Sequence, residues 1–144
     1  MSFLVDTNVV SEWAKPRPDP GVTAWFAQVD EDQVFLSVVT LTELRYGICR
    51  LAPGRRREQL DLWFSDDLPA RFADRIIPID DDIAIACGDV LAEREAAGRP
   101  VEAMDAFIVA TARVIGLTLV TRNEVHFAGS VAEIINPWSQ AGGN

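Results

Sequence analysis

The chain has 144 residues, 49% of them hydrophobic, and a formal net charge of −9 at pH 7. This length and composition predict a single folded domain and exclude an intrinsically disordered chain. The negative charge argues against binding of nucleic acid by overall charge, but not against an enzyme that binds it through metal ions and a local basic patch. No apolar run is long enough to span a membrane and no signal peptide is recognisable, so we expect a cytoplasmic protein.

Short apolar segments alternate with helical patterns along the chain. Strands are expected, in chain order, at residues 3–5, 34–39, 76–79, 117–120 and 131–135. Helices are expected at residues 9–14, 22–29, 40–51, 55–68, 83–97 and 101–115. Because strands that alternate with helices are joined by right-handed crossovers, we predict an α/β fold with a mostly parallel central sheet and helices on both faces. One domain is expected to cover residues 1–140, followed by a flexible tail at 141–144.

Three local features refine this outline. Pro78 cannot donate a backbone hydrogen bond, which favours a position at a sheet edge or at the end of the strand predicted at 76–79 over a fully paired central position. The acids at 80–82 are expected to cap the helix behind them, where negative charge is favourable. Cys49 and Cys87 lie in apolar helical patterns, and we expect both to be reduced thiols in the core.

Asp6 stands where the first predicted strand meets the first predicted helix. Such a position is the carboxyl end of a strand, and open α/β sheets build their sites at that edge. Asp is also a preferred helix N-cap residue, but Thr7 or Asn8 could cap this helix equally well. From this stretch alone a capping role and a site role are equally well supported, and the decision depends on other acids at the same edge.

Asp105 is the acid whose position most strongly indicates a function. It is followed at intervals of three, four and seven residues by Ile108, Val109 and Ala112, which places the carboxylate on the apolar face of its helix. A buried charge without a partner costs several kcal/mol. An acid that served only the helix dipole would face outward instead. We therefore favour a functional role for Asp105.

Glu43 and Asn123 each have a structural alternative. Thr40 and Glu43 form a capping-box pattern, in which the glutamate side chain would bond a backbone N–H. The helix follows the second strand, however, so Glu43 is expected at the same sheet edge as Asp6. Asn123 follows the strand at 117–120 and is also a common turn residue. Considered with the other acids, both positions favour one shared site.

The expected site contains oxygen ligands without histidine or cysteine. Such ligands suit a hard cation, Mg²⁺ or Mn²⁺, rather than zinc. An ion of this kind activates water and stabilises the oxyanions of phosphodiester hydrolysis. Thr7, Asn8 and Thr121 are candidates for the hydrogen bonds that orient the ligands. The sequence patterns of Ser–His–Asp hydrolases, P-loop proteins and dinucleotide-binding proteins are absent.

Five short motifs carry the candidate residues. They are LVDTNVVS at 4–11, TELRYG at 42–47, DAFIVATA at 105–112, LVTRN at 119–123 and INPW at 135–138. In content and order these motifs resemble those of PIN-domain ribonucleases, specifically the VapC- or FitB-like toxins of bacterial toxin–antitoxin pairs. The resemblance spans nearly the whole chain. It implies a three-layer α/β/α sandwich, Mg²⁺- or Mn²⁺-dependent endoribonuclease activity on RNA, and a homodimer held inactive by a small cognate antitoxin.

The resemblance also implies which residues act in the site. The main metal-binding and catalytic acids would be Asp6, Glu43 and Asp105. The family's fourth acid, where present, falls at Asn123, which offers a carbonyl oxygen but no charge. Three carboxylates can hold one divalent ion, whereas a second ion would depend on the substrate phosphate.

Two polar residues follow Asn123 closely. Glu124 could replace the missing acid, but adjacent side chains generally point in different directions. His126 is the only histidine, which excludes a nuclease that uses two histidines as acid and base. For His126, a position near the site is one interpretation, but a surface loop residue is the interpretation that we favour.

The densest basic segment is a candidate binding surface for RNA phosphate. It contains Arg45, Arg50, Arg55, Arg56 and Arg57. An interface with an acidic partner and a simple solvated face explain these arginines equally well, so the three uses stay open.

Three other functions are alternatives for a chain with these residues. A PIN-like binding module that acts only through partner proteins would fit the loss of an acid at Asn123, but the three acids that are present argue against it. A receiver-like signalling domain would need a lysine near Asp6, and the only lysine, Lys15, lies past the first helix. The same residues would equally serve a nuclease that acts on DNA.

Overall fold

The computed structural model of the protein describes residues 1–138. The tail expected at 141–144 lies outside the described residues. Within the described part, five strands form one sheet: β1 (Phe3–Val5), β2 (Val34–Ser37), β3 (Ile76–Ile77), β4 (Thr118–Val120) and β5 (Ile134–Ile135). The strand order is β3-β2-β1-β4-β5, and every neighbouring pair is parallel.

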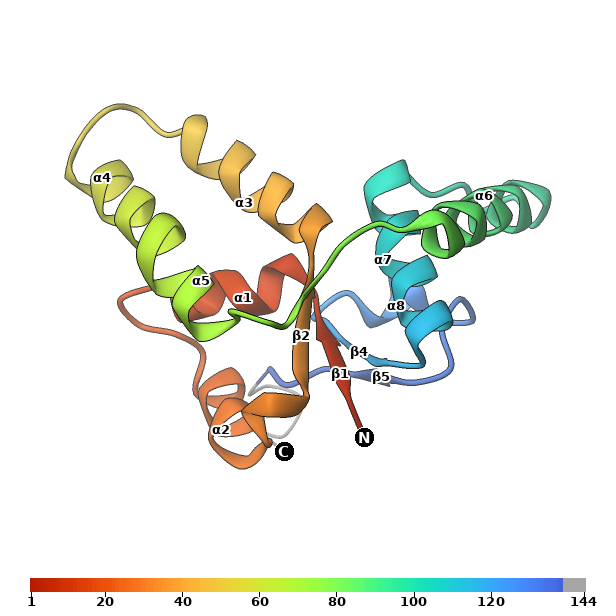
Figure 1. Ribbon diagram of the computed structural model, residues 1–144, viewed down its shortest axis with the longest axis horizontal. Coiled ribbons are helices and arrows are strands. Elements are labelled where there is room, and N and C mark those ends of the chain that lie inside the picture. The colour runs from red at the N-terminus through yellow and green to blue at the C-terminus, as the bar shows by residue number, and fades with distance from the viewer. Residues whose placement is uncertain (139–144) are drawn as a thin grey trace.

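The helices cover both faces of this sheet (Figure 1). They are α1 (Thr7–Trp13), α2 (Pro20–Gln28), α3 (Val38–Cys49), α4 (Arg55–Leu62), α5 (Leu68–Arg71), α6 (Asp81–Ala96), α7 (Ala103–Ile115) and α8 (Glu124–Phe127). Short 3₁₀ and π segments occupy Glu31–Gln33 and Trp63–Asp67. Figure 1 shows α1, α2, α4 and α5 on one side and α6, α7 and α8 on the other. The predicted three-layer α/β/α sandwich is therefore confirmed.

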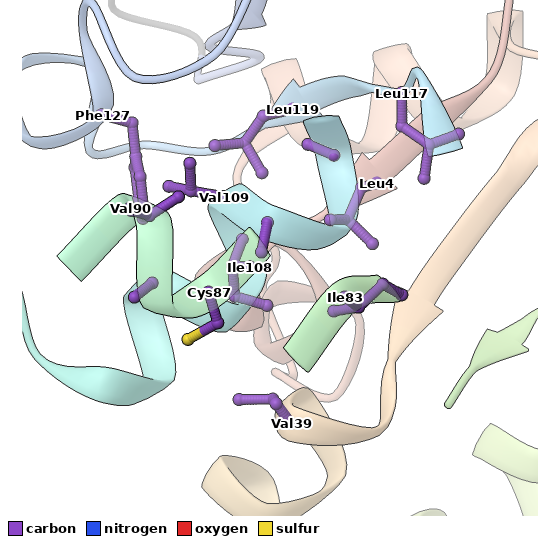
Figure 2. Packing of buried hydrophobic residues seen from close by; sticks show 13 residues of the cluster. Leu4, Val39, Ile83, Cys87, Val90, Ile108, Val109, Leu117, Leu119 and Phe127 are labelled. Atoms are coloured by element: carbon purple, nitrogen blue, oxygen red, sulfur yellow. The ribbon is translucent and has the colours of Figure 1, made fainter. Parts of the chain in front are cut away.

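Adjacent residues of each central strand belong to different hydrophobic cores. Leu4 and Leu119 pack with α6 and α7, whereas Val5 and Val120 pack with α1 and α2. All four side chains are fully buried. The alternation follows from strand geometry, in which successive side chains point to opposite faces. Figure 2 shows the first of the two cores, in which Leu4 and Leu119 face side chains of α6 and α7.

The sheet edge and the start of α6 agree with the local predictions, whereas the last strand differs in length. The strand that precedes Pro78 is β3, which lies at the sheet edge as expected. Asp80 caps α6 by accepting a hydrogen bond from the backbone N–H of Ile83, as expected. The last strand is shorter than predicted, covering Ile134–Ile135 only. No helix within residues 1–138 is long and apolar enough to cross a membrane.

Two predictions about α3 and its surroundings are wrong. The helix predicted to begin at Thr40 begins at Val38, where Ser37 caps it by accepting a hydrogen bond from Val39 N at 3.0 Å, so the capping-box alternative for Glu43 is excluded. Cys49 is exposed, because the buried stripe of α3 contains Leu44 and Ile48 and leaves the next position facing solvent. The other cysteine, Cys87, is buried as predicted.

Candidate active site

The candidate residues come from elements that meet at the carboxyl edge of the sheet. Asp6 follows β1 directly, Thr121 follows β4, and Glu43 lies on α3, the helix that begins where β2 ends. Asp105 is the third residue of α7. Because all neighbouring strands are parallel, their carboxyl ends lie on the same side. A backbone hydrogen bond of 2.9 Å from Asp6 N to Val120 O keeps β1 and β4 in register at this edge.

Asp6 is both the cap of α1 and a buried acid. Its side chain is 5% exposed. Oδ1 accepts a hydrogen bond from Thr7 N at 2.8 Å, and Oδ2 accepts one from the Thr121 hydroxyl at 2.8 Å. Burial raises the pKa of Asp6, the two hydrogen bonds oppose this rise, and the negative charge of Asp105 adds to it. The capping and site interpretations of Asp6 are therefore compatible.

Glu43 is tied to the start of α1. The Thr7 hydroxyl donates a hydrogen bond to Glu43 Oε1 at 2.5 Å. The pKa of Glu43 is raised mainly by burial and further by the charges of Asp6 and Asp105, while the bond from Thr7 lowers it. Two of the three acids thus carry a raised pKa: the charge of Asp105 acts on Asp6, and the charges of Asp6 and Asp105 act on Glu43. This mutual repulsion places the three carboxylates in one electrostatic cluster.

Asp105 is half-buried and pairs with a histidine. Its side chain is 31% exposed, so it lies at the border of the apolar face rather than within the core. Asp105 Oδ2 lies 3.0 Å from His126 Nε2. The prediction that His126 is a surface loop residue is therefore wrong. With only four residues, α8 is too short to show a periodic pattern, but the buried side chain of Phe127 packs in the same core as residues of α7.

A small polar network connects Thr121 with its neighbours. Besides bonding Asp6, Thr121 Oγ1 accepts hydrogen bonds from Asn123 N at 3.0 Å and from Asn8 Nδ2 at 3.5 Å. Asn8 Oδ1 in turn accepts one from Arg122 N at 3.3 Å. Thr7, Asn8 and Thr121 therefore lie where hydrogen bonds can orient the acids, whereas Asn123 contributes its backbone N–H and keeps its side chain exposed.

An open cavity of ≈ 730 Å³ lies beside Asp105. It is lined by Asp105, Arg122, Asn123, Glu124, Val125 and His126. Sequence reasoning did not single out Arg122, although its position next to Asn123 at the end of β4 was a usable signal.

The predicted basic segment is divided among several contacts. Arg45 pairs with Asp61 at 2.7 Å. Arg50 lies over the ring of Tyr46, and Arg57 donates to a backbone carbonyl, while Arg55 is exposed. Arg56 lines a pocket of ≈ 270 Å³ that also contains Thr7 and Glu43. A role of these arginines in RNA or partner binding stays a prediction.

No three His, Cys, Asp or Glu side chains within residues 1–138 form a compact cluster ready to hold a metal ion. The donor chemistry nevertheless fits a hard divalent cation, because the three acids offer only carboxylate oxygens. Glu43 Oε2 and Asp105 Oδ1 form no hydrogen bond with the described residues. Mg²⁺ retains several of its waters in proteins, so these oxygens need not be in direct contact with one another.

Glu43→Gln is expected to stabilise the metal-free protein at pH 7. Folding raises the pKa of Glu43 above its ordinary value of 4.5, so the folded state binds more protons than the unfolded state just above that pH. The free energy of unfolding of the wild type therefore decreases as pH rises through this window. Glutamine avoids this penalty and keeps an acceptor for Thr7. Thermal denaturation in EDTA should show a gain at pH 7 that shrinks toward pH 4.5.

The control for this prediction is Glu133→Gln, which removes the same charge from an exposed position. Its effect on the free energy of unfolding should stay within about 0.5 kcal/mol at both pH values. An equal gain in the two variants would attribute the effect to net charge and contradict the prediction.

The parallel sheet with three carboxylates at its carboxyl edge defines an α/β protein with an acidic candidate active site. The family described as PIN domain matches residues 3–129, and the chain therefore belongs to the PIN-domain family. The chain is 33% identical to "Toxin FitB" of Neisseria gonorrhoeae, over 94% of this chain and 98% of the relative. It is also 33% identical to a "VapC ribonuclease" of Sinorhizobium fredii, over 96% of this chain and 99% of the relative.

Two solved structures have the same fold. The crystal structure of FitAcB from Neisseria gonorrhoeae matches with a TM-score of 0.86 and 33% identity, covering 95% of this chain and 99% of that chain. A toxin–antitoxin complex from Klebsiella pneumoniae matches with a TM-score of 0.71 and 26% identity, covering 95% and 98%. The resemblance to PIN-domain toxins that the sequence motifs indicated is thus confirmed.

Proposed function

We propose that this protein is a divalent-metal-dependent endoribonuclease and the toxin of a toxin–antitoxin pair. The observation that carries the proposal is the cluster of Asp6, Glu43 and Asp105, in which two pKa values are raised by burial and mutual repulsion. The names of the relatives, which include a toxin and a ribonuclease, support the same function.

A divalent ion, Mg²⁺ or Mn²⁺, would be held by the three carboxylates. Burial is the main cause of the two raised pKa values, and repulsion between carboxylates adds to it; a cation would relieve this repulsion. When bound, such an ion supplies an activated water and stabilises developing negative charge on phosphate oxygens. Asn123 adds no charge, so the proposal requires one protein-held ion.

The chain's own residues orient the acids for this chemistry. Thr121 and Thr7 N hold both oxygens of Asp6, and the Thr7 hydroxyl holds one oxygen of Glu43. His126 engages one oxygen of Asp105. These contacts leave Glu43 Oε2 and Asp105 Oδ1 without hydrogen-bond partners among the described residues, so these two oxygens are available to a cation. The side chains are thereby pre-organised, which reduces the entropy lost on binding.

The proposed partners follow from the same family relation. A cognate antitoxin would bind the toxin and keep it inactive, and the complex from Klebsiella pneumoniae is a precedent for such an assembly. We further propose that the protein acts on RNA in the cytoplasm and forms a homodimer.

The decisive experiment is a cleavage assay with the purified chain, free of any partner. Total cellular RNA is incubated with Mg²⁺, with Mn²⁺, with EDTA, and with EDTA followed by excess metal; single-stranded DNA is run in parallel. Glu43→Gln, purified in the same way, controls for contaminating nuclease. We expect metal-dependent RNA cleavage that EDTA abolishes and metal restores, with at least a tenfold lower rate for the variant.

A folded wild-type protein that cleaves RNA with neither metal would contradict the proposal and favour a PIN-like binding module. Cleavage of DNA alone would identify a deoxyribonuclease instead. Equal cleavage by wild type and Glu43→Gln would point to a contaminant or to chemistry outside the acid cluster.

A further inference from the structure

The cavity beside Asp105 is lined by a positively charged side chain, Arg122, in addition to the acid. Arg122 lines this cavity together with Asn123 and His126. Its side chain is exposed, and no carboxylate within residues 1–138 forms an ion pair with it. An arginine without an acidic partner therefore stands next to the candidate catalytic residues.

Arg122 is held in place by contacts at both ends. Its guanidinium lies 5.2 Å from the centre of the Trp138 ring, and its backbone N–H donates to Asn8 Oδ1. Trp138 is 5% exposed and donates its backbone N–H to Asn136 Oδ1 at 3.1 Å. Asn136 Nδ2 in turn donates to Glu124 Oε2 at 2.8 Å. The Glu124 carboxylate, which also lines the cavity, therefore bonds Asn136 and forms no ion pair with Arg122. The guanidinium is thus placed over the Trp138 ring before any ligand arrives.

The negative charge of the site would disfavour RNA binding without a positively charged side chain such as Arg122. A chain with net charge −9 and three clustered acids repels the phosphates of an RNA strand. A guanidinium counters this repulsion locally, because its planar fork binds a phosphate through two parallel hydrogen bonds. Arg45, by contrast, forms an ion pair with Asp61, which partly neutralises its charge toward a phosphate.

We propose that the cavity beside Asp105 is a phosphate subsite for RNA, in which Arg122, placed over the ring of Trp138, binds a phosphate next to the one that is cut. The inference rests on the proposed function, because it takes RNA as the substrate. Its volume of ≈ 730 Å³ is within the range of small-molecule sites and admits a nucleotide unit. Asp105 also lines this cavity, so an RNA strand with one phosphate at Arg122 would have its neighbouring phosphate near the acid cluster.

Binding is tested with a fluorescently labelled single-stranded RNA oligonucleotide and the full chain carrying Asp6→Asn, which blocks cleavage, in the presence of Mg²⁺. Arg122→Gln in this background should weaken binding about tenfold. It should also reduce the slope of log K against log salt concentration by about 0.7, the contribution of one phosphate contact on a single strand. Arg122→Lys keeps the charge and should restore the slope but only part of the affinity.

Arg17→Gln is the matched control, because it removes the same charge from an exposed arginine in the loop between α1 and α2. We expect it to bind RNA like the parent protein. In the cleavage-competent background, Arg122→Gln should raise KM about tenfold with little change in kcat, because the contact holds substrate and transition state alike.

The outcomes separate this inference from the proposed function. If RNA binds and is cut by the wild type but Arg122→Gln leaves affinity and salt slope unchanged, the phosphate subsite is wrong and the nuclease proposal stands. Equal weakening by Arg17→Gln would also overturn the subsite, since the effect would then come from net charge. If the wild type neither binds nor cuts RNA, the proposed function itself fails.

Discussion

Asp6→Asn is expected to lower the rate of RNA cleavage about a thousandfold while the protein stays folded. The substitution keeps the shape of the side chain and removes its charge, which the proposed cation site requires. The amide oxygen can still accept the hydrogen bond from Thr7 N that caps α1. The initial rate with saturating Mg²⁺ or Mn²⁺ measures the loss, and circular dichroism verifies that the fold is retained.

The matched control is Asp80→Asn. Asp80 also caps a helix, accepting a hydrogen bond from Ile83 N at 2.9 Å, but it is exposed and does not affect the pKa of Asp6 or Glu43. Its cleavage rate should stay within about twofold of the wild type, as expected for a surface change outside the site. Activity of Asp6→Asn close to the wild-type rate would rule out its assigned role, and a comparable loss in Asp80→Asn would attribute the effect to capping.

Phe127→Ala is expected to lower the free energy of unfolding by about 3–5 kcal/mol, the usual range for a buried Phe changed to Ala. The Phe127 side chain is 1% exposed and packs in the core that also contains Val90 and Val109 (Figure 2). Such a loss is a large share of the roughly 5–15 kcal/mol by which domains are stable. Urea denaturation at pH 7 without metal measures it.

Phe127→Ala should also disturb the site, because Phe127 anchors the short helix α8. The neighbouring His126 ring contacts Phe127 at a centroid distance of 4.9 Å and bonds Asp105. The control is Val125→Ala on the same helix, where the side chain is 84% exposed. It should change the free energy of unfolding by less than about 0.5 kcal/mol. Similar losses in the two variants would mean that α8 is not anchored by its buried ring.

Most of the fold was predictable because its signals are local. Strands at 3–5 and 76–79 and the helix that ends at Gly116 were recognised from apolar patterns and from residues that stop them. Gly116 adopts a left-handed φ of 81°, which suits glycine at the end of α7. The α/β/α layering follows from the alternation of strands and helices. The errors concern element ends and short helices: α3 begins before Thr40 because Ser37 caps it, and the four-residue helix α8 was not predicted.

The candidate site was predictable in part. Asp6, Glu43 and Asp105 were selected because each stands near a strand end or on an apolar helix face. Cys49 and His126 were misjudged, since their exposure and contacts depend on how elements pack. The pairing of His126 with Asp105 joins residues 21 positions apart and depends on a four-residue helix too short to show periodicity.

By itself, the sequence determined the order of strands and helices, the three acids and the family to which the motifs point, because these depend on local patterns of residue type. Only the tertiary structure decided that Thr121, 115 residues away, donates to Asp6, and that Thr7 donates to Glu43. It alone placed Arg122 in the cavity of Asp105 and over Trp138. The physical reason is that hydrogen bonds, burial and mutual repulsion act over a few ångströms in space, and only the packing of parallel strands sets those distances.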